Sequence, residues 1–251
     1  MCRNAFIFLI NTLVVLLLTC SISHAETLSI ASASNFQKAL KVLAADFEKQ
    51  TKITVRISSG SSGKLAAQIS QGAPFDIFLS ADQSKPDFLV ENGHAIAESQ
   101  FTYAIGQLVL WKPSATDTVN ESLLSDNLKG SIAIANPKHA PYGRAGEQVL
   151  TKFSAKNIKR ITAENVSQAY QFISSGNVAM GLIARSLLDD NTPENTFWLI
   201  PSSLHEPIKQ DAVITRYGQN NPAAQQFIRF IKSEASINTL KTLGYLDPSV
   251  S

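Results

Sequence analysis

Short apolar strands alternate with helices along the start of the chain, and this alternation constrains the fold more than any other feature of the sequence. Residues 27–34 and 53–59 have the character of strands, and 76–81 is a third, mostly apolar one. A second helix is expected over 65–72. In the first helix, large apolar residues recur at spacings of four, three and four, which marks one helix face: Phe36, Leu40, Leu43 and Phe47. This order predicts a parallel sheet covered by helices.

The alternation is repeated in a second block, and a shorter third block follows. The second block holds four predicted strands, at 103–113, 131–137, 178–184 and 196–201. Its two predicted helices are at 143–153 and 166–176. The third block has a strand at 211–218 and a helix at 222–233. We therefore predict an α/β fold of two lobes, each a mixed, mainly parallel sheet flanked by helices, joined by crossing strands.

The first 25 residues predict export. Arg3 precedes an apolar run over 5–18, and the small-x-small triplet at 23–25 precedes Glu26. This is the layout of a signal peptide over 1–25, cleaved after about Ala25, which predicts a periplasmic protein. A membrane anchor and lipidation at Cys20 are the alternatives. Because both cysteines lie in this segment, the mature chain has no disulfide, and no cysteine serves as a nucleophile or metal ligand.

Two lobes, export and the absence of disulfides together favour a solute-binding protein that closes on its ligand by a hinge. The predicted division is lobe 1 at 26–105, lobe 2 at 106–208 and a return of lobe 1 at 209–251. The 22 basic and 20 acidic residues nearly cancel, and there is no basic run. Nucleic acids and membrane surfaces are therefore not expected as partners.

Enzyme motifs do not appear in the sequence. No two histidines stand at metal-ligand spacing, and no Gly-x-Ser-x-Gly elbow occurs. We expect neither catalytic residues nor protein ligands to a metal cation. The alternative from another class is an exported serine hydrolase that uses Ser34 or Ser62.

Two strand-to-helix junctions in the first block carry hydroxyl donors. Ser34 follows the first strand, and Gln37 stands three residues later, so a helix-capping box is an alternative role for this serine. The second junction is the stretch "SSGSSGKLAAQI" at 58–69, which resembles a phosphate loop. It fails the Walker A spacing at both ends, because Ser58 replaces its first glycine and Leu65 follows Lys64. What remains is a pair of serines between two glycines, at 60–63.

The second block offers two further junctions with backbone donors. Residues 141–143, Pro-Tyr-Gly, open one helix, and Asn165 or Ser167 caps another at which Val166 offers its N–H. Helix N-termini bind anions through free N–H groups and the helix dipole. A cleft of neutral donors suits a fully ionised oxyanion such as sulfate, molybdate or tungstate, which never has a proton to donate.

Four segments in this order resemble the periplasmic molybdate-binding proteins of ABC importers: "ASASNFQKAL", "SSGSSGKLAAQISQGAPFDIFLSADQ", "ANPKHAPYGRAGEQVL" and "ENVSQA". The resemblance spans nearly the whole mature chain and implies the type II binding-protein fold. It implies that the chain binds molybdate or tungstate without a cofactor, acts as a monomer and delivers the anion to an inner-membrane permease driven by an ATPase. Sulfate or another oxyanion is the alternative ligand.

The resemblance also implies the ligand-binding residues. The two serines are Ser34 and Ser62, with Ser61 as the neighbour after a slip of one residue, and the backbone donors are Tyr142 and Val166. Many family members add a tyrosine hydroxyl, but Ala184 stands at that position here. The Tyr142 phenol reaching inward is one compensation.

Three charged residues of the shared segments receive no ligand role. For the two aspartates the reason is that a carboxylate repels a dianion. We interpret Asp76 and Asp82 as structural, capping or hinge-supporting residues, and expect Lys64 to point to solvent from the first turn of its helix.

Overall fold

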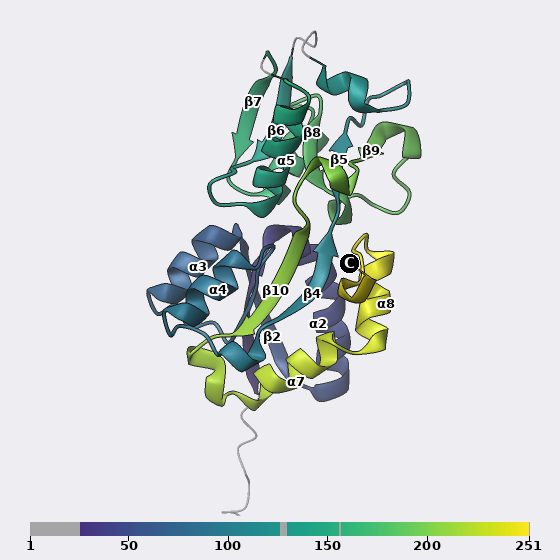
Figure 1. The fold of residues 1–251 in the computed structure, drawn as a ribbon. Coiled ribbons are helices and arrows are strands. Elements are labelled where there is room, and N and C mark those ends of the chain that lie inside the picture. Colours follow the sequence, from purple (N-terminus) through teal and green to yellow (C-terminus); the bar gives the residue numbers. More distant parts are fainter. Residues whose placement is uncertain (1–25, 126–129, 156, 251) are drawn as a thin grey trace, which may run out of the picture.

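The computed structural model describes residues 26–125, 130–155 and 157–250. The predicted signal peptide, with Cys20 and the cleavage point after Ala25, lies outside the described residues. The chain forms two lobes, one above the other in Figure 1, each built on its own five-stranded sheet. In the parts of the chain that the structure describes, no helix has the length and apolar character needed to cross a bilayer.

Lobe 1 contains the two ends of the described chain. Its strands are β1 (Thr27–Ala33), β2 (Thr54–Gly60), β3 (Ile77–Leu79), β4 (Phe101–Gly106) and β10 (Ile208–Ile214). Its helices are α2 (Gln37–Thr51), α3 (Ser62–Ser70), α4 (Ser84–Glu91), α7 (Pro222–Ile231) and α8 (Glu234–Thr242). The strand order is β2-β1-β3-β10-β4, in which β1 is parallel to β2 and β3, and β10 is antiparallel to both neighbours.

Lobe 2 is formed by the middle of the chain. Its elements are β5 (Leu108–Trp111), β6 (Ser131–Ala135), α5 (Pro141–Lys152), β7 (Lys159–Ala163), α6 (Val166–Ser174), β8 (Gly181–Ala184) and β9 (Phe197–Leu199). The strand order is β7-β6-β8-β5-β9, with β6 parallel to β7 and β8, and β5 antiparallel to β8 and β9. Both sheets are thus mixed and flanked by helices, which confirms the predicted fold class.

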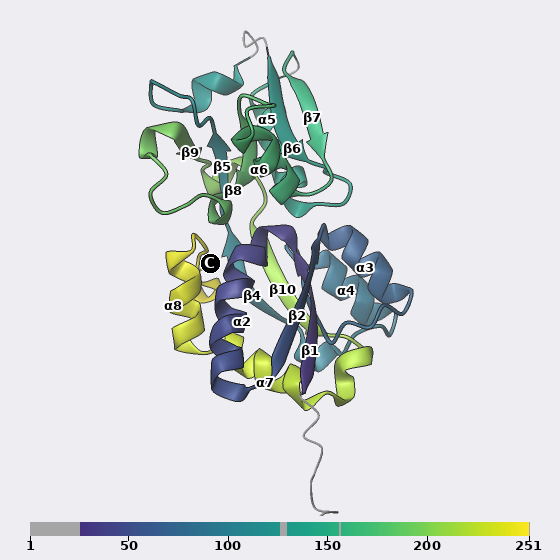
Figure 2. The same cartoon turned by 180° about the vertical axis from the view of Figure 1, so that it is seen from behind.

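The two faces of the lobe 1 sheet are covered by different helices, and the strands alternate accordingly. In β3, Ile77 and Leu79 join a cluster with α2, α7 and α8, whereas Phe78 between them joins a cluster with α3 and α4. Figures 1 and 2 show these two helical layers on either side of the sheet. Because successive side chains of a strand point to opposite faces, a strand buried on both faces is apolar throughout.

The chain crosses between the lobes twice. The predicted strand at 103–113 consists of β4 in lobe 1 and β5 in lobe 2, separated by Gln107. The return runs from β9 to β10, and at the boundary Ile208 of β10 pairs with Gly106 of β4. We propose the lobe division at 26–105, 106–208 and 209–251 on the basis of these crossings.

Among its labelled strands and α-helices, the structure contains three that the sequence patterns did not indicate: β7, α4 and α8. Strand β7 is a partly exposed edge strand, so its polar residues give no apolar run. Helix α4 buries only Pro86 and Leu89, which is too few positions for a helical period. The strand predicted at 211–218 begins and ends earlier, at 208 and 214, because the chain turns into a short 3-10 helix at Tyr217.

Candidate functional site

A small cavity lies between the lobes, where strand ends and helix starts from both lobes meet. Its volume is about 10 Å³, which is room for one small ion or solvent molecule. Twelve residues line it: Ala33, Ser34, Asn35, Gly60, Ser61, Ser62, Ala81, Ala140, Pro141, Tyr142, Asn165 and Val166. The structure therefore brings together five sequence-predicted site residues, Ser61 among them, while Ala184 is not in the lining.

Ser34 has a different local role from the capping box that was the alternative. It begins a 3-10 turn at Ser34–Phe36, and neither this turn nor α2 has a side-chain cap. The Ser34 hydroxyl instead accepts a long hydrogen bond of 3.5 Å from Ser167 N–H of lobe 2, and the Ser167 hydroxyl donates to Ser34 O at 2.9 Å. The Ser34 O–H hydrogen therefore remains available to an anion in the cavity.

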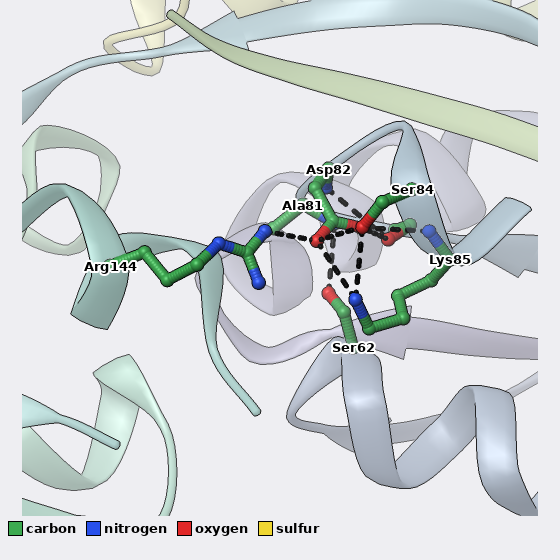
Figure 3. Close-up of polar contacts among 7 residues, drawn as sticks. Ser62, Ala81, Asp82, Ser84, Lys85 and Arg144 are labelled. Carbon is green, nitrogen blue, oxygen red and sulfur yellow. Dashed lines mark hydrogen bonds and ion pairs between the residues drawn. The ribbon is translucent and has the colours of Figure 1, made fainter. Parts of the chain in front are cut away.

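The two serines of the Gly-Ser-Ser-Gly stretch differ in their partners. Ser62 Oγ accepts a hydrogen bond of 3.0 Å from Ala81 N–H (Figure 3). Ser61 stands at the N-cap of α3 but makes no side-chain cap bond, and its buried Oγ has no partner in the described structure. A buried hydroxyl without a partner costs free energy. Ser61 is therefore the serine whose hydroxyl needs a ligand.

Lobe 2 presents two helix N-termini to the cavity. Pro141 and Tyr142 open α5, and Val166 opens α6, where Asn165 Oδ1 caps the helix by accepting from Gln168 N–H at 3.0 Å. The first N–H groups of a helix have no partner inside it. Tyr142 and Val166 accordingly lie where backbone donors reach the cavity, and both helix dipoles add positive potential there.

Asn35 lines the cavity and was missed by the sequence patterns. Its side chain is buried, and Nδ2 donates to Gln210 Oε1 at 2.9 Å and to Tyr245 Oη at 3.3 Å. Its Oδ1 has no partner. Within the described chain, three buried side-chain polar atoms lack a partner, and two of them, Asn35 Oδ1 and Ser61 Oγ, belong to this cavity. The only signal was that Asn35 follows Ser34 at the strand end.

A buried polar network behind the cavity holds Tyr142 and Asn35 in place. Gln210 of β10 donates from Nε2 to Tyr142 Oη at 3.2 Å, and Tyr103 of β4 donates to Gln210 Oε1 at 3.1 Å. The Tyr142 phenol thus lies against the crossing strands, where Gly106 is required because a Cβ there would overlap the hydroxyl. Burial raises the pKa of Tyr142 well above its ordinary value, so the phenol stays neutral beside an anion.

Ala184 lies at the end of β8, fully buried and paired with Leu108. Its side chain cannot replace the family's tyrosine hydroxyl.

The cavity lining contains polar groups but no charged side chain. None of its twelve residues is a lysine, arginine, histidine or carboxylate. Among the residues that the structure describes, no group of three or more His, Cys, Asp or Glu side chains is placed to hold a metal ion. The donors are hydroxyls and backbone N–H groups, which together suit an anion that supplies only acceptors.

Fold and cavity together define a class of protein: a two-lobed binding protein that holds a small ligand between its lobes through neutral groups. The family described as bacterial extracellular solute-binding protein matches residues 28–246. The chain belongs to this family. It is a family of binding proteins, not of enzymes, which confirms that prediction and does not favour the hydrolase alternative. Its extracellular character agrees with export, while cleavage after Ala25 remains a prediction.

Relatives narrow the resemblance. The molybdate-binding protein ModA of Azotobacter vinelandii is 40% identical over 236 residues, covering 91% of this chain and 93% of the relative. ModA of Rhodobacter capsulatus is 39% identical and covers 86% of each. The solved structure of the A. vinelandii periplasmic molybdate-binding protein gives a TM-score of 0.82 at 39% identity, over 88% of this chain and 99% of that one. The predicted resemblance is confirmed.

Proposed function

We propose that this chain is the periplasmic binding component of an ABC importer and that it binds molybdate, with tungstate close behind, in the cavity between the lobes. The observation that carries the proposal is the unsatisfied buried hydroxyl of Ser61, in an uncharged lining that also holds the hydroxyls of Ser34 and Ser62 and two helix N-termini. The names of the relatives from A. vinelandii and R. capsulatus support molybdate as the anion.

The anion is held by donors from both lobes. Ser34 and Ser61 donate through their hydroxyls, with Ser62 beside them, and Tyr142 and Val166 donate through their backbone N–H groups. Burying a bare dianion costs many kcal/mol. Charge-assisted hydrogen bonds of about 1.5–3 kcal/mol each, together with the dipoles of α5 and α6, offset this cost.

Asn35 joins this set through rotation of its amide. A dianion repels Oδ1, but a half-turn of the amide directs Nδ2 into the cavity. A matching half-turn of Gln210 lets its Nε2 donate to Asn35 Oδ1 while its Oε1 accepts from Tyr142 Oη. Both orientations fit the same atomic positions, because amide oxygen and nitrogen are nearly the same size. Asn35 is thereby a sixth ligand-binding residue.

Selection between anions of equal charge rests on size. Sulfate and molybdate both carry two charges and four acceptor oxygens, so the lining satisfies either chemically. They differ in the distance of the oxygens from the central atom. The small cavity therefore discriminates between them by how well this distance places the oxygens against the donors. Phosphate differs in another way, because it keeps a proton at neutral pH and the donor lining offers that proton no carboxylate.

We propose further that the chain acts as a monomer after removal of residues 1–25 and delivers the anion to an inner-membrane permease driven by an ATPase.

The test is calorimetric titration of the purified mature protein with molybdate, tungstate, sulfate and phosphate. We expect tight binding of molybdate and tungstate and binding of sulfate weaker by at least about 100-fold, which is about 2.7 kcal/mol. Equal binding of sulfate would show that the protein is a general oxyanion carrier, and binding of phosphate alone would contradict the donor-only lining.

A further inference from the structure

Three ion pairs connect the lobes around the binding cavity. Each joins a lobe 1 side chain to one of lobe 2, and their N–O distances are 2.7, 2.8 and 2.5 Å in this order: Lys38–Asp189, Lys64–Glu164 and Arg144–Asp82. Lys64 therefore does not simply point to solvent, as expected from the sequence, but reaches across to Glu164, two residues before α6 begins. Gly63 beside it donates its N–H to His139 O of lobe 2 at 3.0 Å.

The Arg144–Asp82 pair differs from the other two in burial. The Asp82 side chain is 11% exposed and that of Arg144 39%, whereas both side chains of the Lys64–Glu164 pair are about half exposed. Solvent screens exposed pairs, so they contribute little. Asp82 is further fixed by the Ser80 hydroxyl at 3.0 Å and by Lys85 N–H at 3.2 Å (Figure 3). Arg144 thus meets a carboxylate that is already held in place.

Both members of this pair adjoin binding residues. Asp82 directly follows Ala81, whose N–H donates to Ser62 Oγ in the cavity. Arg144 lies two residues after Tyr142, in the first turn of α5. Figure 3 shows the Arg144 guanidinium extending from α5 to Asp82 above Ser62. The pair therefore fixes the N-terminus of α5 against the segment of lobe 1 that holds Ala81 and Asp82, next to Ser62.

The pair also lines a second cavity that has residues in common with the binding cavity. This cavity of about 40 Å³ is lined by Asp82 and Arg144 and shares Ala81 and Pro141 with the binding cavity. On its other side, Arg144 and Gln148 also line a surface hollow of about 800 Å³.

We propose that the Asp82–Arg144 pair is a latch that positions α5 over the bound anion and sets the rate at which the anion is released. Neither side chain lines the binding cavity, so both act as positioning residues. The proposal rests on the proposed function for the identity of the anion. Burial alone raises the pKa of Asp82, but the hydrogen bond from Arg144 and the charge of Lys85 bring it below its ordinary value, so the carboxylate is charged when the latch is closed.

The variant that tests the latch is Arg144→Gln. Asp82 is the partner that the structure gives Arg144, and Asp82 keeps Ser80, Ser84 and Lys85, so the fold is preserved. By stopped-flow displacement of molybdate, we expect the release rate to rise about tenfold, the size of one lost charge-assisted hydrogen bond. The association rate should stay within about twofold, and the melting temperature of the free protein should not change. Arg144→Lys should restore part of the slow release.

Lys64→Gln is the matched control. It also removes one positive charge from a pair across the cleft, so any general loss of attraction for anions is the same, but its pair is exposed and lines none of the cavities described above. Its release rate should stay within about twofold of the wild type. Equal effects of Arg144→Gln and Lys64→Gln on release would overturn the latch.

The outcome separates the two proposals. If the wild type binds none of the four oxyanions, the proposed function fails, and the latch is then tested by small-angle X-ray scattering of the ligand-free protein. A larger radius of gyration for Arg144→Gln than for Lys64→Gln supports the latch, and identical radii contradict it. If molybdate binds and Arg144→Gln releases it at the wild-type rate, the latch fails and the proposed function stands.

Discussion

In the proposed binding site, the two lobes offer the anion different kinds of donor. Lobe 1 contributes side chains, namely Ser34, Asn35, Ser61 and Ser62, whereas lobe 2 contributes the backbone at Tyr142 and Val166. A side-chain donor changes with a single substitution, but a backbone donor is retained by every residue except proline. Substitutions in lobe 1 can therefore test which donor atoms the anion requires. In lobe 2 the helix geometry keeps the backbone donors in place whatever the side chain.

The largest expected effect is that of a charge placed in lobe 1. Asn35→Asp keeps the shape of the side chain but sets a carboxylate beside the anion. Two like charges about 4 Å apart repel by about 4 kcal/mol at an effective dielectric constant of about 20. We expect molybdate affinity to fall at least about 100-fold, measured by calorimetry. Asn120→Asp, at an exposed turn cap of lobe 2, is the control and should bind as the wild type does.

The next effect is the loss of a lobe 1 hydroxyl. Ser61→Ala should weaken binding about 30-fold, the worth of a charge-assisted hydrogen bond of about 2 kcal/mol. Because Ser61 Oγ has no partner in the ligand-free structure, the melting temperature of the free protein should stay equal or rise. Ser70→Ala, at the exposed end of the same helix, serves as the control. Unchanged affinity in Ser61→Ala would return the binding role to Ser62 alone.

A lobe 2 donor should give the smallest effect. Val166 is the first residue of α6, where proline is tolerated, and Asn165 before it is extended, as a residue preceding proline should be. Val166→Pro removes one N–H and leaves the helix, so affinity should fall about tenfold. Val166→Ala loses packing but keeps the N–H and should bind within about twofold. If both variants bind equally well, α6 contributes only its dipole.

The contrast between the lobes also explains what the sequence could predict. Local patterns predict the strand and helix periods, the helix starts near Tyr142 and Val166, and the place of Ser34 at a strand end. Each of these features depends only on neighbouring residues. The hydroxyl of Ser62 accepts from Ala81 N–H, 19 positions away in the chain, whereas that of Ser61 has no partner, so the sequence alone did not show which of the two hydroxyls is free. Asn35 was missed because its partners lie on β10 and beyond α8.

Contacts between the lobes were the least predictable part. Asp82 and Arg144 are separated by 62 positions and by a change of lobe. The sequence indicated only a structural or hinge-supporting role for Asp82. Gly63 is a second example, because a Cβ at this position would lie 3.1 Å from His139 O of the other lobe, a contact that the local sequence does not indicate. Such pairings form where the two lobes meet, and the periodicity of apolar residues within one strand or helix does not encode them.

The two crossing strands have a thermodynamic consequence. Gly106 of β4 and Ile208 of β10 are paired at the boundary between the lobes. The two connections therefore bend together, so that the lobes rotate about a single hinge line. Opening and closing then change essentially one soft coordinate, so closure sacrifices little conformational entropy. With so small an entropic opposition, contacts of one or two hydrogen bonds are enough to decide how long the protein stays shut.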